Sequence, residues 1–157
     1  MPYLCDVNVL LALCVGQHQH HPATRRWVSG IREAGQLTVC RLAQLRLLRL
    51  LNNPAVMGSQ VCRGQAAWGI YDLLMSDERF IFRSEPAGLE TELRRLSTPF
   101  IHSPKAWQDA YLAAFGAAAG LTDSLAGHGF FQLRERAMGS RSLELKAPGS
   151  GLLRRHF

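Results

Sequence analysis

Two aspartates lie within apolar sequence, and they restrict how this chain can fold more than any other feature does. Asp6 stands in Leu-Cys-Asp-Val-Asn-Val-Leu-Leu, and Asp109 stands in Trp-Gln-Asp-Ala-Tyr-Leu-Ala-Ala-Phe. Burying an unpaired carboxylate is costly, so each aspartate needs a partner, and two that converge can share one cation. The pair therefore predicts a divalent-metal site.

Each aspartate also has a simpler interpretation. Asp6 precedes an apolar helical stretch, where aspartate commonly caps the first turn. Asp109 lies about one turn inside a predicted helix, where the helix dipole favours a surface aspartate. The metal interpretation is preferred because both aspartates have apolar neighbours and because aspartate has poor helix propensity.

Strand-like and helix-like segments alternate along the chain. Apolar segments predict strands at residues 3–7, 37–40 and 79–82. Helical spacing and capping signals predict helices at residues 9–15, 23–34, 41–51, 63–75, 88–96 and 104–120. This alternation predicts an α/β fold with three layers, in which helices flank a short, mainly parallel sheet. Asp6 then falls at the carboxyl end of a strand, where open α/β sheets build their sites.

The length and apolar content of the chain suit one globular domain. The chain has 157 residues, and we expect residues 1–146 to form the domain and residues 147–157 to be a loose tail. Asp6 interrupts the first apolar run, which is atypical of a signal peptide. No apolar run reaches the length of about 18 residues that a membrane span requires. We therefore expect a cytoplasmic protein without a membrane partner.

The spacing of the cysteines and the net charge restrict which metals and partners this chain is expected to bind. The four cysteines are widely spaced without a Cys-x-x-Cys pair, which argues against a zinc site or a disulfide framework and predicts buried thiols. The formal charge of +6 comes almost wholly from arginine. Arginine favours bidentate phosphate contacts, so a polyanion is a plausible partner, although an acidic protein would satisfy the same charge.

Three stretches together resemble the PIN-domain family, and most closely its VapC-type toxins. They read DVNVLLAL at residues 6–13, RLLRLLNNPAVMG at residues 46–58 and HSPKAWQDAYLAAFGAAAG at residues 102–120. The resemblance covers about residues 3–120. It implies a metal-dependent endoribonuclease that hydrolyses RNA phosphodiester bonds as the toxin of a type II toxin–antitoxin system. It also implies a VapB-like antitoxin and a homodimer.

The resemblance assigns the site residues. Asp6 and Asp109 are expected to be catalytic and to hold Mg²⁺, or alternatively Mn²⁺, which would activate a water for attack on the phosphodiester. Asn8 is expected to orient the Asp6 carboxylate or a bound water, although it could simply cap the following helix. We expect an antitoxin helix to dock on the early helices around Trp27 and Leu48.

Two of the four acidic positions of the family are neutral in this chain. The third matches Gln44 and the fourth, aligned on Gly129-Phe130, matches Gly127. Gln44, Asp123 and His128 are candidate accessory residues, but Asp123 lies about 13 Å from position 127 along a strand. The alternative function is therefore a catalytically depleted PIN-domain protein that binds RNA or an antitoxin without cleaving.

Arginines beside Gln44 form a candidate RNA path. Arg41, Arg46 and Arg49 recur at helical spacing and could contact phosphates. The same arginines could equally form a solvated helix face.

Overall fold

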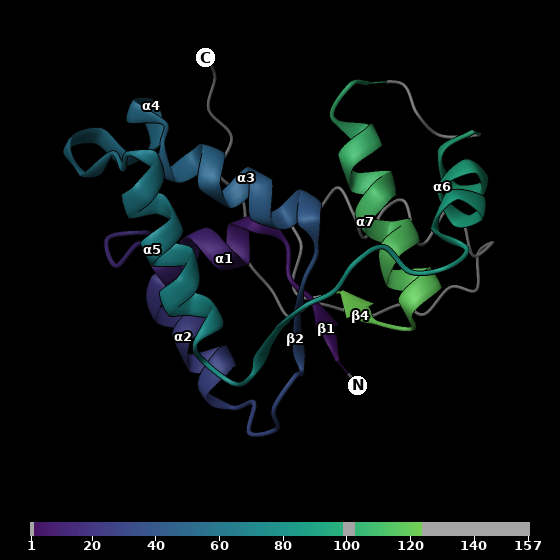
Figure 1. The fold of residues 1–157 in the computed structure, drawn as a ribbon, viewed down its shortest axis with the longest axis horizontal. Helices are drawn as coiled ribbons and strands as arrows, with labels where there is room; N and C mark the ends of the chain where they lie inside the picture. Colours follow the sequence, from purple (N-terminus) through teal and green to yellow (C-terminus); the bar gives the residue numbers. More distant parts are fainter. Residues whose placement is uncertain (1, 99–102, 124–157) are drawn as a thin grey trace, which may run out of the picture.

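A single parallel sheet organises the molecule. The computed structural model describes residues 2–98 and 103–123 (Figure 1). The sheet has four strands in the order β3-β2-β1-β4. All its pairings are parallel, and Tyr3 is in register with both Leu37 and Thr122. The strands are β1 (Tyr3–Leu4), β2 (Leu37–Val39), β3 (Phe80–Phe82) and β4 (Thr122–Asp123). The first strand of the chain therefore lies inside the sheet.

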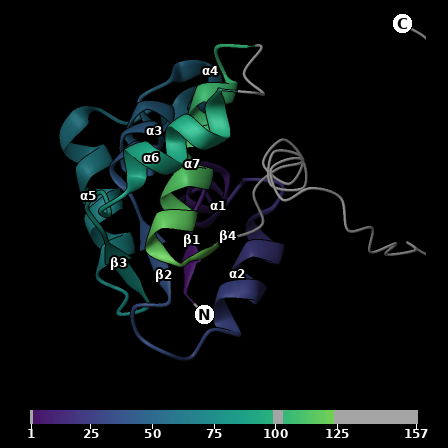
Figure 2. The same ribbon diagram turned by 90° about the vertical axis from the view of Figure 1, so that its right-hand side faces the viewer.

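Helices cover both sides of this sheet. Figure 1 shows α1 to α5 on one side and α6 with α7 on the other, and Figure 2 shows α7 in front of the strands. The helices are α1 (Val7–Cys14), α2 (His21–Ser29), α3 (Arg41–Leu51), α4 (Pro54–Met57), the 3₁₀ helix Gly58–Gln60, α5 (Gly64–Met75), α6 (Leu89–Ser97) and α7 (Ala106–Ala119). The three-layer α/β architecture predicted from the sequence is confirmed.

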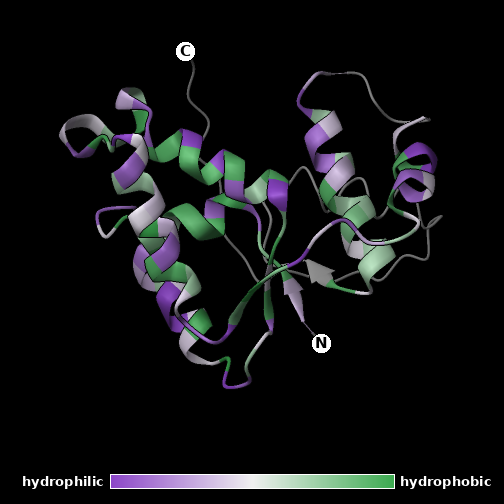
Figure 3. Cartoon of the chain, in the orientation of Figure 1, coloured by the Kyte–Doolittle hydropathy of each residue, from purple (hydrophilic) through white to green (hydrophobic). Residues whose placement is uncertain are grey.

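The core lies between the sheet and its two helical layers. Every residue of β2 is buried, as expected for a parallel strand covered on both faces. Figure 3 shows α1 as almost uniformly hydrophobic, whereas α6 carries polar residues along its length. The largest side chains without any exposure come from α1, β2, α3 and α7, and include Leu10, Leu37, Leu47 and Phe115. Thus α1 is an internal helix, and Asp6 lies directly before its first residue.

Several predicted boundaries are wrong. The predicted strand 3–7 ends at Leu4, since α1 begins at Val7. The predicted helix 23–34 is α2, which begins earlier because Pro22 fits the first turn of a helix, and which ends before Gly30. The short helix α4 was not predicted. The Asn53 side chain caps it by accepting a hydrogen bond of 2.9 Å from the Ala55 N–H.

The predictions about the cysteines, a membrane span and the tail have different outcomes. All four cysteines are free thiols; Cys5 and Cys40 are buried, whereas Cys14 and Cys62 are only half-buried. None of the helices in residues 2–98 and 103–123 is long and apolar enough to cross a membrane. The predicted tail, residues 147–157, lies outside the described residues.

Candidate active site

Asp6 lies where β1 ends and α1 begins. Its backbone is extended at the N-cap position, and its carbonyl accepts hydrogen bonds from the N–H groups of Val9 and Leu10. Its side chain makes no capping hydrogen bond to the helix and is 7% exposed. A capping role therefore does not account for this buried carboxylate.

Two side chains approach the Asp6 carboxylate. The amide nitrogen Nδ2 of the exposed Asn8 donates a hydrogen bond of 2.9 Å to Oδ2. The guanidinium nitrogen Nη1 of Arg46, on α3, lies 3.5 Å from Oδ1, and the Arg46 side chain is 24% exposed. Asn8 thus fixes the orientation of the carboxylate, while Arg46 supplies an opposite charge.

Asp109 occupies the first turn of α7 and is half-buried. Within residues 2–98 and 103–123, the structure gives its side chain no hydrogen bond or ion pair. Figure 1 shows the first turns of α1, α3 and α7 at the same edge of the sheet, beyond the carboxyl ends of the strands. The turn that follows Asp6 and the turn that contains Asp109 therefore lie at one edge of the sheet, and the shared ion of the two carboxylates stays a prediction.

Gln44, the neutral counterpart of an expected acid, lies buried on α3 with 4% exposure. Its Oε1 atom, the one side-chain atom able to ligate a cation, accepts a hydrogen bond from Nη1 of Arg41. The Arg41 guanidinium also lies 4.6 Å from the centre of the Phe82 ring. Burial raises the pKa of Tyr71, whereas a hydrogen bond to Gln44 and the charge of Arg41 act against that shift. Gln44 thus joins α3, β3 and α5 beside the site.

A further acidic residue at this edge was missed from the sequence. Glu85 follows β3, and its Oε1 accepts a hydrogen bond of 3.0 Å from the Tyr111 hydroxyl of α7. Burial and then this contact raise the pKa of Tyr111 far above its ordinary range. Burial also raises the pKa of the Cys40 thiol, with a smaller contribution from the charge of Asp6. The strand-end rule that singled out Asp6 could have found Glu85 as well.

The structure describes two of the remaining candidates, Asp123 and Arg49. Asp123 lies on β4 in register with Leu4, which is two residues before Asp6 on the neighbouring strand. Gly127 and His128 lie outside the described residues. Arg49 is exposed on α3.

The described residues hold no cluster of three or more histidine, cysteine, aspartate or glutamate side chains arranged for a metal ion. Because Tyr111 engages the Glu85 carboxylate, the candidate metal ligands at this edge are the two carboxylates of Asp6 and Asp109, which are too few to surround an ion by themselves. Mg²⁺ commonly binds through one or two carboxylates and completes its coordination with waters and substrate phosphate. The chemistry of the two donors fits such an ion.

Comparison with known proteins finds relatives in sequence and in fold. No family model matches the chain. Ribonuclease VapC41 from two strains of Mycobacterium tuberculosis, CDC 1551 and H37Rv, is 40% identical over 121 residues, which cover 74% of this chain and 83% of the relative. The fold is similar to the crystal structure of Mycobacterium tuberculosis VapC20, a sarcin-ricin loop cleaving toxin. That match has a TM-score of 0.63 at 16% identity and covers 85% of this chain and 95% of VapC20.

Proposed function

Because this chain belongs to the VapC family of PIN-domain ribonucleases, we propose that it hydrolyses RNA phosphodiester bonds in a metal-dependent reaction at Asp6. It is the toxin of a type II toxin–antitoxin pair, and the cytoplasm, where RNA is translated, is its expected location. The observation that carries the proposal is the buried carboxylate of Asp6 at the carboxyl end of β1, oriented by Asn8.

The residues of the site divide into ligands and positioning groups. Asp6 and Asp109 would hold Mg²⁺ or Mn²⁺, and the bound ion supplies positive charge to the phosphodiester and activates the attacking water. Asn8 keeps the Asp6 carboxylate in one orientation through its hydrogen bond. The exposed side chains of Arg41 and Arg49 line the outer side of α3, where they can contact RNA phosphates.

Metal removal tests this function. The purified chain is expected to cut single-stranded or looped RNA in Mg²⁺ or Mn²⁺, to stop cutting when a chelator removes the ion, and to recover when the ion is restored. Cleavage of an end-labelled RNA on a denaturing gel measures each step. Cutting that persists in chelator contradicts a metal-dependent site. Binding of RNA without cutting in any ion would favour the depleted, non-cleaving alternative.

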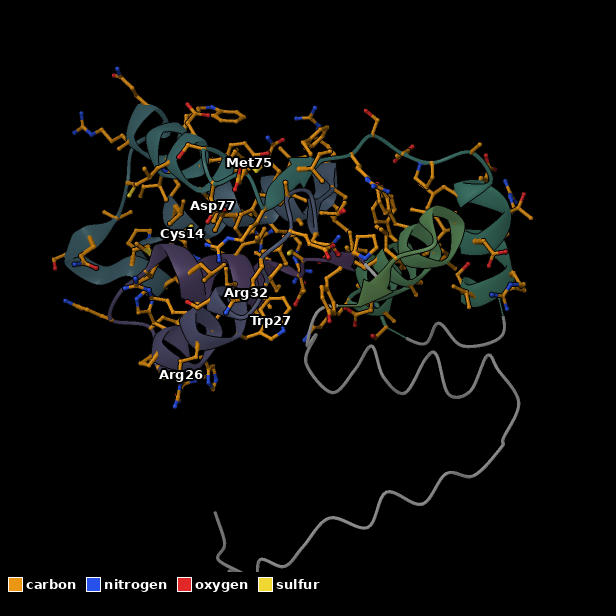
Figure 4. The ribbon with its side chains drawn as sticks, turned by 90° about the horizontal axis from the view of Figure 1, so that it is seen from below. Cys14, Arg26, Trp27, Arg32, Met75 and Asp77 are labelled. Carbon is orange, nitrogen blue, oxygen red and sulfur yellow. The ribbon has the colours of Figure 1, made fainter. Side chains whose placement is uncertain are left out.

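We propose a groove between α2 and α5 as the docking site of a VapB-like antitoxin. The groove has a volume of about 480 Å³ and lies over the end of α1. Its apolar lining comprises Leu13, Val28, Ile70, Leu73, Leu74 and Phe80. Figure 4 labels Cys14 and Asp77 of the groove, and shows Arg26 of α2 pointing away from α5. Polar and charged side chains, among them Arg25, Asp77 and Arg79, also line the groove. A groove with both apolar and charged walls suits an amphipathic helix.

This groove differs from the docking surface predicted around Trp27 and Leu48, neither of which lines it. The Trp27 ring instead packs edge-on against Tyr3, with 5.4 Å between ring centres. Leu48 is half-buried and packs against the core. Homodimer formation remains a prediction, and sedimentation of the purified chain would measure it.

The substitution Leu73→Arg tests the groove. Leu73 is 74% exposed, so the fold should tolerate the change. The positive charge of the new arginine, placed among the apolar side chains of the groove, is expected to weaken antitoxin binding by roughly ten-fold or more. Co-purification with the protein encoded beside this chain, followed by a binding titration, measures the loss. Leu45→Arg is the matched control, because Leu45 is an exposed leucine outside the groove. Equal losses in the two variants would contradict this docking site.

A further inference from the structure

Arg46 makes an ion pair that differs from the others in the described residues. The other pairs join neighbours in sequence, namely Asp77 with Arg79, Glu90 with Arg94 and Glu92 with Arg95. Arg46 lies instead in the middle of α3 and Asp6 at the start of α1, and α3 packs directly against α1. The fold therefore holds a guanidinium against the carboxylate that the proposed reaction needs.

The surroundings of Arg46 keep it at this position. On α3, its neighbours Gln44 and Leu47 are buried, so the helix face that includes them is fixed against the core. With the Arg46 side chain 24% exposed and Asp6 mostly buried, the pair is only partly screened by water. A cation that binds Asp6 therefore meets a like charge at close range, and the two compete for one carboxylate.

We propose that Arg46 is a counter-ion that Asp6 keeps until an RNA phosphate draws it away. A guanidinium recognises a phosphate as well as a carboxylate, so a backbone phosphate at the site can take over Arg46. Asp6 is then left to the metal ion. Binding of the RNA phosphate and binding of the metal thus reinforce each other, and Arg46 is a positioning residue that couples them. This inference rests on the proposed metal-dependent function.

The coupling also gives the two-carboxylate site a physical rationale. Gln44 brings no charge, and its oxygen is engaged by Arg41. The RNA-free site therefore has few negative charges to attract a metal ion, and Arg46 neutralises one of them. The phosphate supplies the missing negative charge and removes the competing positive charge in a single step. The site would then hold its metal tightly only when RNA is present.

Calorimetric titration with Mn²⁺ tests this coupling without measuring cleavage. In the absence of RNA, Arg46→Ala is expected to bind Mn²⁺ about ten-fold more tightly than the parent, a typical coupling between two sites. A non-cleavable 2′-O-methyl oligonucleotide is expected to tighten Mn²⁺ binding to the parent by a similar factor, but not binding to Arg46→Ala. Arg46→Lys, which keeps the charge, should behave like the parent. Arg26→Ala is the control, because Arg26 is exposed on α2 away from this site, and it should leave the Mn²⁺ affinity unchanged.

The outcomes separate this inference from the proposed function. An unchanged or weaker Mn²⁺ affinity in Arg46→Ala overturns the counter-ion role, because a merely structural arginine gives that result. If Asp6→Asn binds Mn²⁺ as the parent does, the metal site itself is misassigned. Absence of Mn²⁺ binding in both the parent and Arg46→Ala overturns both. Thermal melting of each variant confirms that the protein under titration is folded.

Discussion

Asp6→Asn is expected to reduce RNA cleavage by at least about a hundred-fold, the usual scale for removing one preorganised charge from an active site. Asparagine has the shape of aspartate and keeps an oxygen that can accept the hydrogen bond from Asn8. The substitution therefore removes the charge at the end of β1 but preserves the packing around it. The initial cleavage rate at saturating Mg²⁺ measures the loss.

A matched aspartate gives the control for this experiment. Asp72 is exposed on α5, and Asp72→Asn makes the same chemical change there. Its cleavage rate should remain within about two-fold of the parent rate, as is usual for surface substitutions. Equal rates for Asp6→Asn and the parent would show that the cutting comes from another site or from a contaminating nuclease.

Phe115→Ala is expected to destabilise the fold by about 3–5 kcal/mol, the usual cost of emptying a buried phenylalanine site. Phe115 has 0% exposure and lies on α7, the helix that carries Asp109. Its ring packs between this helix and the core, with 6.2 Å between its centre and that of Tyr111. Urea unfolding followed by circular dichroism measures the change in the free energy of unfolding.

The same helix provides a control aromatic residue. Trp107 is 54% exposed, and Trp107→Ala should change stability by no more than about 0.5 kcal/mol. Losses of similar size in the two variants would mean that α7 does not pack through Phe115 as the structure describes. A variant Phe115→Ala that yields no folded protein agrees with the prediction, provided that Trp107→Ala folds.

The elements with strong local signals were predicted from the sequence. The helix predicted at residues 41–51 is α3, with the same ends, because its arginines and leucines alternate at helical spacing and Asn52-Asn53-Pro54 stops it. The helix α4 escaped prediction because four residues are too few to show a helical period. The early end of α2 was also missed, since Ile31 continues its apolar pattern beyond Gly30.

The sequence predicts which residues belong to the site better than it predicts which side chains contact one another there. Asp6 could be singled out because a carboxylate in an apolar strand end is unusual in itself. Its pairing with Arg46 depends on how α3 crosses α1, which no local pattern encodes. The hydrogen bond between Tyr111 and Glu85 likewise joins α7 to the end of β3. Side chains that meet through tertiary packing require the fold before they can be identified.

The place of β1 inside the sheet has a consequence for synthesis on the ribosome. β1 contains Tyr3, and one of its two neighbours, β4, contains Thr122, so roughly 120 residues of synthesis separate the two strands. At about 5–20 residues per second this takes roughly 6–24 s. During that interval β1 can pair only with β2, and α7 with Asp109 has not yet left the ribosome. We therefore expect each newly made chain to lack the two-carboxylate site while most of it is translated, which protects the RNAs of the ribosome that is making it.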